Sequence, residues 1–136
     1  MKLVFADTSY FVAITRPRDP WQAVAIHARK IVGRGRLITT DEVLVECLNA
    51  LRRAGVKSRQ NAVKMVKAIL STPDVCVIPQ SRHSFMRGIQ LYECRMDKDY
   101  SLTDCISMAL MREKHIQDVL TTDHHFAQEG FRVLIR

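Results

Sequence analysis

The sequence has no apolar run long enough to cross a membrane, which takes about 20 consecutive apolar residues. Arg16 and Arg18 interrupt the N-terminal segment too early for the apolar part of a signal peptide. These absences predict a cytoplasmic protein with no membrane partner.

Paired cysteines are also missing. The four cysteines, Cys47, Cys76, Cys94 and Cys105, include no C-x-x-C pair, and each has apolar neighbours. We therefore interpret them as reduced residues of the core rather than as a disulfide or zinc site.

Common catalytic motifs do not occur either. The chain has neither the G-x-x-x-x-G-K-[ST] nor the G-x-G-x-x-G loop that holds nucleotide phosphates. No motif marks a serine or cysteine nucleophile, and we interpret His124 and His125 as part of a turn rather than as a catalytic base. The remaining candidates for chemistry are acids.

What the chain does contain is an excess of positive charge. Its 14 arginines and 7 lysines outnumber 14 acids, which gives a net charge of +7. This balance favours a polyanionic partner such as nucleic acid, although a well-solvated surface would have the same charge. With 136 residues and no repeat, low-complexity tract or linker, we expect one domain over residues 1–136.

Short apolar segments alternate with amphipathic ones along the chain. Strands are predicted at residues 3–5, 36–39, 74–79, 119–122 and 132–135, and the longest helices at 39–54, 81–96 and 101–115. Thr39 with Glu42, and Ser101 with Asp104, have the spacing of a capping box. This alternation predicts an α/β fold: a single three-layer α/β/α domain with a central parallel sheet of about five strands.

Four carboxylates can be assigned to one edge of this sheet. Asp7 follows the first strand and Asp123 the fourth, and such sheets bind ligands at the carboxyl ends of their strands. Asp104 lies at a helix start, which capping alone would also explain. Glu46 lies in the apolar run 43–48, where it either has a metal or basic partner or is simply exposed.

Four neighbouring carboxylates repel one another unless divalent cations neutralise them. Hard oxygen ligands favour Mg²⁺ or Mn²⁺. In a chain that is basic elsewhere, such a pocket suits a phosphodiester, because metals polarise the phosphate and lower the pKa of water. We therefore predict Mg²⁺, with Mn²⁺ as the alternative, at this cluster.

Around these acids the sequence resembles the PIN-domain family, and in size and layout its VapC-type toxins from toxin–antitoxin pairs. Each acid lies in one matching segment: residues 5–9 (FADTS), 44–48 (LVECL), 102–105 (LTDC) and 120–126 (LTTDHHF). The resemblance extends over nearly the whole chain. It implies a PIN-like fold and a metal-dependent endoribonuclease that cleaves RNA phosphodiesters.

The resemblance also implies roles for individual residues. Asp7 and Asp104 would be the principal metal ligands, and Glu46 and Asp123 would complete the site. Hydroxyl groups supporting the metal or its waters would come from Thr8, Ser9 and Thr122. The partners implied are an RNA substrate, a second copy in a homodimer, and an antitoxin that inserts a basic or aromatic side chain into the acidic pocket.

The densest basic region lies between residues 52 and 67. We expect it to contact RNA or the antitoxin, with a plain solvated helical hairpin as the alternative. Its candidate residues are Arg52, Arg53, Lys64 and Lys67.

Other classes of protein also place an acid after the first strand. A haloacid-dehalogenase-type phosphatase needs a second aspartate two residues later, where this chain has Ser9. A phospho-receiver domain pairs acids directly after its first strand, which this chain does not. A PIN relative that only binds RNA or protein would keep the fold without the activity.

Overall fold

The computed structural model describes residues 2–33 and 35–136. Five parallel strands form one sheet in the order β3-β2-β1-β4-β5. They are β1 (Leu3–Ala6), β2 (Arg36–Thr40), β3 (Val75–Ile78), β4 (Asp118–Leu120) and β5 (Arg132–Val133). The predicted α/β fold with a central parallel sheet is confirmed.

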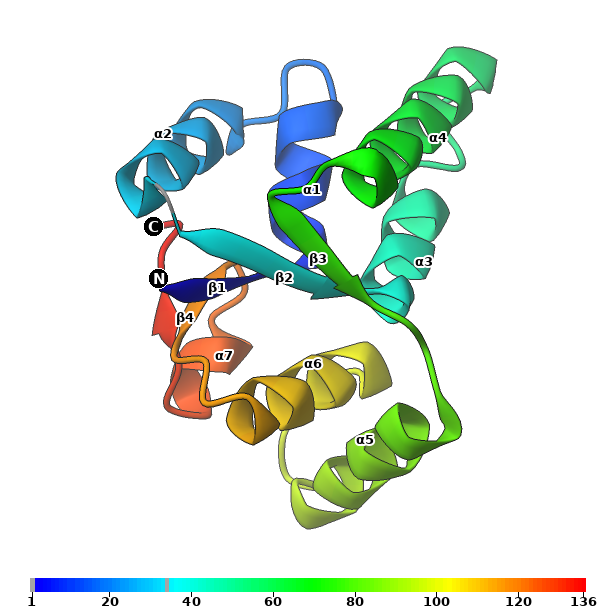
Figure 1. Cartoon of the computed structure of the whole chain (residues 1–136). Helices are drawn as coiled ribbons and strands as arrows, with labels where there is room; N and C mark the ends of the chain where they lie inside the picture. The colour runs from blue at the N-terminus through cyan, green and yellow to red at the C-terminus, as the bar shows by residue number, and fades with distance from the viewer. Residues whose placement is uncertain (1, 34) are drawn as a thin grey trace.

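Helices cover both faces of this sheet (Figure 1). They are α1 (Thr8–Thr15), α2 (Gln22–Val32), α3 (Asp41–Ala50), α4 (Val56–Ser71), α5 (Arg82–Cys94), α6 (Leu102–Glu113) and α7 (His125–Gln128). In Figure 1, α1, α2 and α4 lie above the sheet, and α5, α6 and α7 lie below it. Helix α3 contacts α1 and α4 and also α6, so it joins the two layers.

The central strand β1 is buried because both faces of the sheet are covered. Val4, Phe5 and Ala6 are almost completely inaccessible, as the short apolar run predicts. Phe5 pairs in register with Ile38 of β2 on one side and Val119 of β4 on the other. Residues from β1, β2 and β4 therefore meet at the middle of the sheet, and the segments that follow these strands start next to one another.

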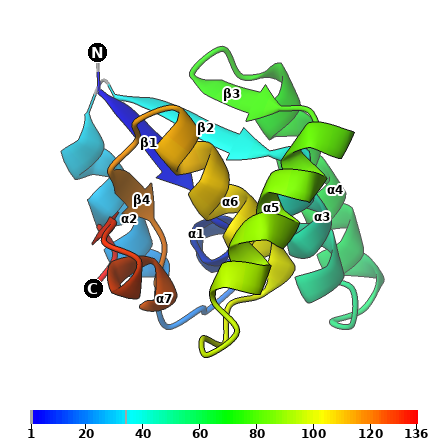
Figure 2. The same cartoon turned by 90° about the horizontal axis from the view of Figure 1, so that it is seen from below.

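Helix α6 is the best-buried helix, and it packs against α5. Figure 2, seen from below, shows the two helices side by side in front of the sheet. Gly88 of α5 makes the approach possible, because a Cβ at this position would lie 2.3 Å from Cγ1 of Ile106. Met108 and Met111 of α6 are fully buried. Helix α6 is thus a fixed support for Asp104 at its start.

An ionic cluster fixes the segment around α7 to the layer below the sheet. The Glu129 carboxylate accepts hydrogen bonds from Arg95 at 2.6 Å, Arg112 at 2.5 Å and the Tyr100 hydroxyl at 3.1 Å. Attraction to these groups outweighs burial, so the pKa of Glu129 is lowered. The end of α7 is therefore fixed to the end of α5 and to α6.

Two local predictions are wrong. The N-cap of α3 is Thr40, whose hydroxyl accepts a hydrogen bond from the Val43 amide, whereas Thr39 belongs to β2 and donates to the Ala6 carbonyl. All four cysteines are free, but only Cys47 and Cys105 are buried, while Cys76 and Cys94 are exposed.

Among the described residues, no helix combines the length and apolarity that crossing a bilayer requires.

Candidate metal site

Asp7 lies directly after β1 and is the N-cap residue of α1. Its side chain does not cap the helix, because it points to β4 instead, where Oδ2 accepts a hydrogen bond of 2.8 Å from the Thr121 hydroxyl. The residue is only 4% exposed, and its other oxygen, Oδ1, has no hydrogen-bond partner among the described residues. A buried carboxylate oxygen without a partner is costly unless a ligand satisfies it.

Thr121 connects the ends of β1 and β4. Besides donating to Asp7, its hydroxyl oxygen accepts the Asp123 amide at 3.0 Å and lies 2.9 Å from the Ser9 hydroxyl. Ser9 in turn accepts the Thr122 amide at 2.9 Å. These bonds fix the two segments that carry Asp7 and Asp123 relative to each other.

Asp104 lies at the start of α6, where it caps the helix and is close to the other acids. Its amide donates to the Ser101 hydroxyl at 3.0 Å, and its Oδ2 accepts the Ser101 amide at 3.2 Å, which is the predicted capping box. The residue is 8% exposed. The cap explains the residue's position but not its neighbours, which are the other acids of the cluster.

Glu46 lies on α3 and is half-buried. Its Oε1 accepts a hydrogen bond from the Thr8 hydroxyl, in the first turn of α1. Cys47, the next residue, is fully buried, and desolvation followed by the charges of Asp7 and Glu46 raises the pKa of its thiol to about 12. Cys47 is therefore an inert core residue beside the acids.

Asp123 follows β4 and is partly exposed. Its Oδ1 accepts the His125 amide at 2.9 Å. The imidazole Nδ1 of His125 lies 3.1 Å from this oxygen and 3.7 Å from Oδ2 of Asp104. Ligand atoms of Asp104, Asp123 and His125 all lie within 4.8 Å of one another, as a shared cation would require.

The acids influence one another electrostatically. Burial, followed by repulsion from Asp104 and Glu46, raises the pKa of Asp7 to about 7, while the Thr121 hydrogen bond opposes this shift. Burial, followed by the charges of Asp123 and Glu46, raises the pKa of Asp104 to about 6. The four acids thus form one cluster.

No lysine or arginine of the described residues pairs with any of these four acids. Basic partners are used elsewhere: Lys2 and Arg132 pair with Asp118, and two arginines pair with Glu129. The cluster therefore keeps its negative charge in a chain whose net charge is +7. Its donor set of carboxylate oxygens, with the unpartnered Oδ1 of Asp7, fits a hard divalent cation.

The three hydroxyl groups predicted to support the metal differ in whether they contact the acidic cluster. Thr8 and Ser9 face the cluster, bonded to Glu46 and to Thr121 respectively. The Thr122 side chain makes no hydrogen bond to the described residues, and only its amide takes part. Sequence reasoning missed Thr121, and it interpreted His125 as part of a turn. Only His124 lies in the turn, whereas His125 is the first residue of α7, and its ring faces two of the acids.

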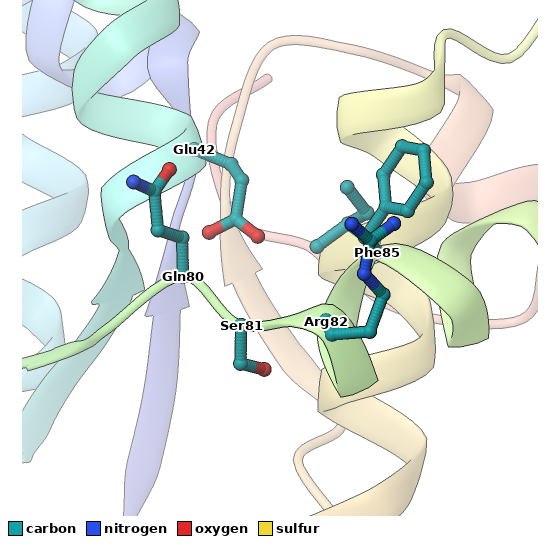
Figure 3. Close-up of a pocket in the computed structure, with 6 residues that line it drawn as sticks. Glu42, Gln80, Ser81, Arg82 and Phe85 are labelled. Carbon is teal, nitrogen blue, oxygen red and sulfur yellow. The ribbon is translucent and has the colours of Figure 1, made fainter.

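A surface pocket of about 510 Å³ lies between α3, α5 and α6 (Figure 3), and its lining residues do not include the four acids. Glu42, one turn before Glu46, accepts a hydrogen bond of 2.9 Å from the Ser84 hydroxyl. The Arg82 guanidinium lies over the Phe85 ring, 5.5 Å from its centre. The pocket thus combines one acid, one arginine and an aromatic ring on the same side of the sheet as Asp104.

The predicted basic residues form no part of the acidic cluster. All are exposed, in the turn after α3 or on α4: Arg52, Arg53, Lys64 and Lys67. Lys64 lines a second pocket of about 590 Å³ with Val56, Arg59, Gln60 and Val63.

Known proteins identify the class to which this fold and this cluster belong. The family model of the PIN domain matches residues 4–131, so the chain belongs to the PIN-domain family. The resemblance stated from the sequence is confirmed, and it excludes the phosphatase and phospho-receiver alternatives. Within the family, the chain is similar to the sarcin–ricin loop cleaving toxin VapC20 of Mycobacterium tuberculosis, with 26% identity and a TM-score of 0.84. That likeness covers 94% of this chain and 95% of VapC20.

More distant structures share the fold. FitAB bound to a DNA fragment is 16% identical with a TM-score of 0.69, covering 96% of this chain and 92% of that one. FitAcB from Neisseria gonorrhoeae is 12% identical with a TM-score of 0.68, covering 96% of both chains. No curated protein matches the sequence significantly.

Proposed function

We propose that the chain is a metal-dependent endoribonuclease and the toxin of a toxin–antitoxin pair. PIN-family membership and the likeness to a toxin that cleaves RNA support the class of activity. The observation that carries the proposal is the cluster of four acids with no lysine or arginine partner among the described residues, in which Oδ1 of Asp7 is buried without a hydrogen bond.

In this proposal Asp7 and Asp104 are the principal ligands of Mg²⁺ or Mn²⁺, and Glu46 and Asp123 complete the site. Such a cation supplies Lewis-acid polarisation of the phosphate and a lower pKa for the attacking water. The chain's own residues orient the ligands. Thr121 holds one oxygen of Asp7 and leaves the other free.

The remaining ligands are oriented in the same way. The Ser101 amide holds one oxygen of Asp104, and the Thr8 hydroxyl holds one oxygen of Glu46. Hydrogen bonds of this kind fix ligand geometry before the substrate arrives, which is how hydrogen-bond partners of ligands support metal sites. A rigid acidic site in a basic chain attracts RNA to the protein and cations to the site.

The substrate we propose is a structured RNA, and the sarcin–ricin loop is the first to test, because VapC20 is a toxin that cleaves it. The partners we propose are an antitoxin protein and a second copy of the chain in a homodimer. The exposed basic residues of α3–α4 are the candidate contact for RNA or antitoxin.

The direct test is cleavage of total cellular RNA by purified protein. We expect discrete fragments with Mg²⁺ or Mn²⁺ and none with EDTA. Asp7→Asn removes a ligand charge and should abolish cleavage, while Asp97→Asn, a change at a surface acid with 76% side-chain exposure, should leave it intact. Circular dichroism and thermal melting establish that each variant is folded.

Full cleavage by a folded Asp7→Asn variant, or cleavage that persists in EDTA, would contradict the proposed metal site. Metal binding without cleavage of cellular RNA or the sarcin–ricin loop would favour the binding-only PIN alternative.

A further inference from the structure

His125 contributes the only nitrogen atom among the side chains that surround Asp104 and Asp123 in the described cluster. Its Nδ1 is buried and makes no hydrogen bond to any described residue, although Oδ1 of Asp123 is only 3.1 Å away. The direction between the two atoms therefore does not suit hydrogen bonding. A buried nitrogen that makes no hydrogen bond and lies close to carboxylate oxygens can be satisfied by a cation that it shares with them.

The imidazole ring is held in place without using Nδ1. The His125 amide is bonded to Asp123, which fixes the backbone of the turn. The Tyr100 ring packs against the imidazole with 5.3 Å between ring centres, and the Tyr100 hydroxyl is bonded to Glu129. Only 19% of the His125 side chain is exposed. The orientation of Nδ1 is therefore set by packing, before any ligand binds.

The distances from Nδ1 of His125 to the two acids are compatible with one coordination sphere. Bonds of about 2.1 Å place adjacent ligands of an octahedral cation about 3 Å apart. The separations of 3.1 Å to Asp123 and 3.7 Å to Asp104 are close to that value. The unpartnered Oδ1 of Asp7 is a further free donor of the same cluster, since Asp104 raises the pKa of Asp7.

We infer that Nδ1 of His125 is a direct ligand of the cation held by Asp104 and Asp123. This inference rests on the proposed metal site and adds a nitrogen to its four carboxylates. Imidazole nitrogen suits transition metals, whereas Mg²⁺ prefers oxygen ligands. The cluster is therefore expected to bind Mn²⁺ more tightly than Mg²⁺ by a margin that depends on His125.

The test uses Mn²⁺ bound to the whole protein without RNA. Pulsed electron paramagnetic resonance detects the magnetic coupling between Mn²⁺ and a directly bound ¹⁴N nucleus. We expect this coupling in the wild type and in His124→Gln, the matched control at the exposed neighbouring histidine. It should disappear in His125→Gln. Protein labelled with ¹⁵N-histidine should show the ¹⁵N pattern instead, which assigns the nitrogen without any variant.

Affinity gives a second readout. Losing partners that merely orient metal ligands costs roughly 10–100-fold in affinity, so losing a ligand should weaken Mn²⁺ binding at least about ten-fold. Mg²⁺ binding should change less, and titration calorimetry of the folded variants measures both.

Each contrary outcome is distinct. Mn²⁺ bound to wild type without nitrogen coupling would overturn the role of His125 and leave the proposed function standing. Coupling that persists in His125→Gln and is lost in His124→Gln would also overturn it. Absence of any Mn²⁺ binding would overturn the metal site itself.

Discussion

Asp7 is an ionisable residue in a buried position, where the charged form of its carboxyl group is unfavourable. The pKa of an aspartate in an unfolded chain is near 3.8, and in the folded protein burial raises that of Asp7 to about 7. Between these two values the folded state holds a proton that the unfolded state has lost. The free energy of unfolding must therefore fall as pH rises, by up to about 1.4 kcal/mol per pH unit for one such group.

We accordingly predict that, in EDTA, the protein becomes less stable between about pH 4 and pH 7. Asp104, whose pKa is raised to about 6, adds to the same trend. Divalent cations should reverse it, because they stabilise the ionised carboxylates and bind only the folded state. Urea unfolding at a series of pH values, with EDTA and with Mg²⁺, measures the effect.

Asp7→Asn provides the comparison. The variant should show a weaker pH dependence and a smaller gain from Mg²⁺, while Asp97→Asn should follow the wild type. A wild-type stability that rises over this pH range in EDTA would contradict the burial of an ionisable cluster.

A second prediction for a single residue concerns Thr121. Thr121→Val keeps the side-chain shape but removes the donor to Asp7 and the acceptor for the Asp123 amide. We expect a loss of about 1–3 kcal/mol in the free energy of unfolding and weaker Mg²⁺ binding, because the pKa of Asp7 rises further without this bond.

The matched control is Thr122→Val, whose hydroxyl makes no bond to the described residues. It should change stability by no more than about 0.5 kcal/mol. Equal effects of the two substitutions, measured by urea unfolding and by calorimetry, would contradict the assignment.

Among the elements, α5 and α6 depend on one glycine. A Cβ added at Gly88 would lie 2.3 Å from Cγ1 and 3.4 Å from Cα of Ile106, so the Ile106 side chain or one of the two helices has to move. We expect Gly88→Ala to cost about 1–3 kcal/mol in stability. Because Ile106 lies two residues after Asp104, Mg²⁺ affinity should fall as well.

Removing the obstructing side chain tests this explanation. In Gly88→Ala combined with Ile106→Ala, the loss should be smaller than the sum of the two single losses, since the clash is gone. Strict additivity in urea unfolding would show that Gly88 is needed for another reason.

At the scale of elements, the sequence predicts which segments are strands and helices better than where they begin. Thr39 and Thr40 both suit an N-cap, and the choice depends on Thr39 reaching the Ala6 carbonyl in the neighbouring strand, which lies 33 residues away along the chain. Thr121 and Thr122 differ in the same way. Both follow β4, but only Thr121 turns its hydroxyl to Asp7, and local pattern cannot distinguish them.

The local pattern also fails to predict how exposed a cysteine is. Cys76 lies in an apolar run, but β3 is an edge strand, so alternate side chains are open to solvent. His125 begins α7 instead of lying in the predicted turn, and only its neighbours in space reveal that its ring faces the acids.

For the whole molecule, the net charge of +7 predicts RNA binding that weakens with salt. We expect charge reversal of the α3–α4 basic set to lower RNA affinity and to flatten its salt dependence, by roughly 0.7–0.9 in the log–log slope for each phosphate that is no longer neutralised. The set is Arg52, Arg53, Lys64 and Lys67. Fluorescence anisotropy measures the RNA affinity, and the Asp7→Asn substitution is included in each protein so that the RNA is not cleaved.

A second four-residue reversal separates local binding from overall charge. It changes exposed basic residues elsewhere and reaches the same net charge: Lys30, Arg36, Lys98 and Lys114. Equal reductions of affinity in both variants would indicate that only overall charge acts. Unchanged affinity for both RNA and antitoxin in the first variant would exclude the basic set as a binding surface.

The order of the strands has a consequence for how the protein comes into being. Strand β1 is made long before its neighbour β4, and the hydrogen bond between Asp7 and Thr121 spans 114 residues. A nascent chain therefore cannot assemble the acidic cluster until the segment with Thr121 and Asp123 has been made, and such distant pairing folds slowly. The proposed nuclease site is therefore incomplete until β4 has been made and has paired with β1.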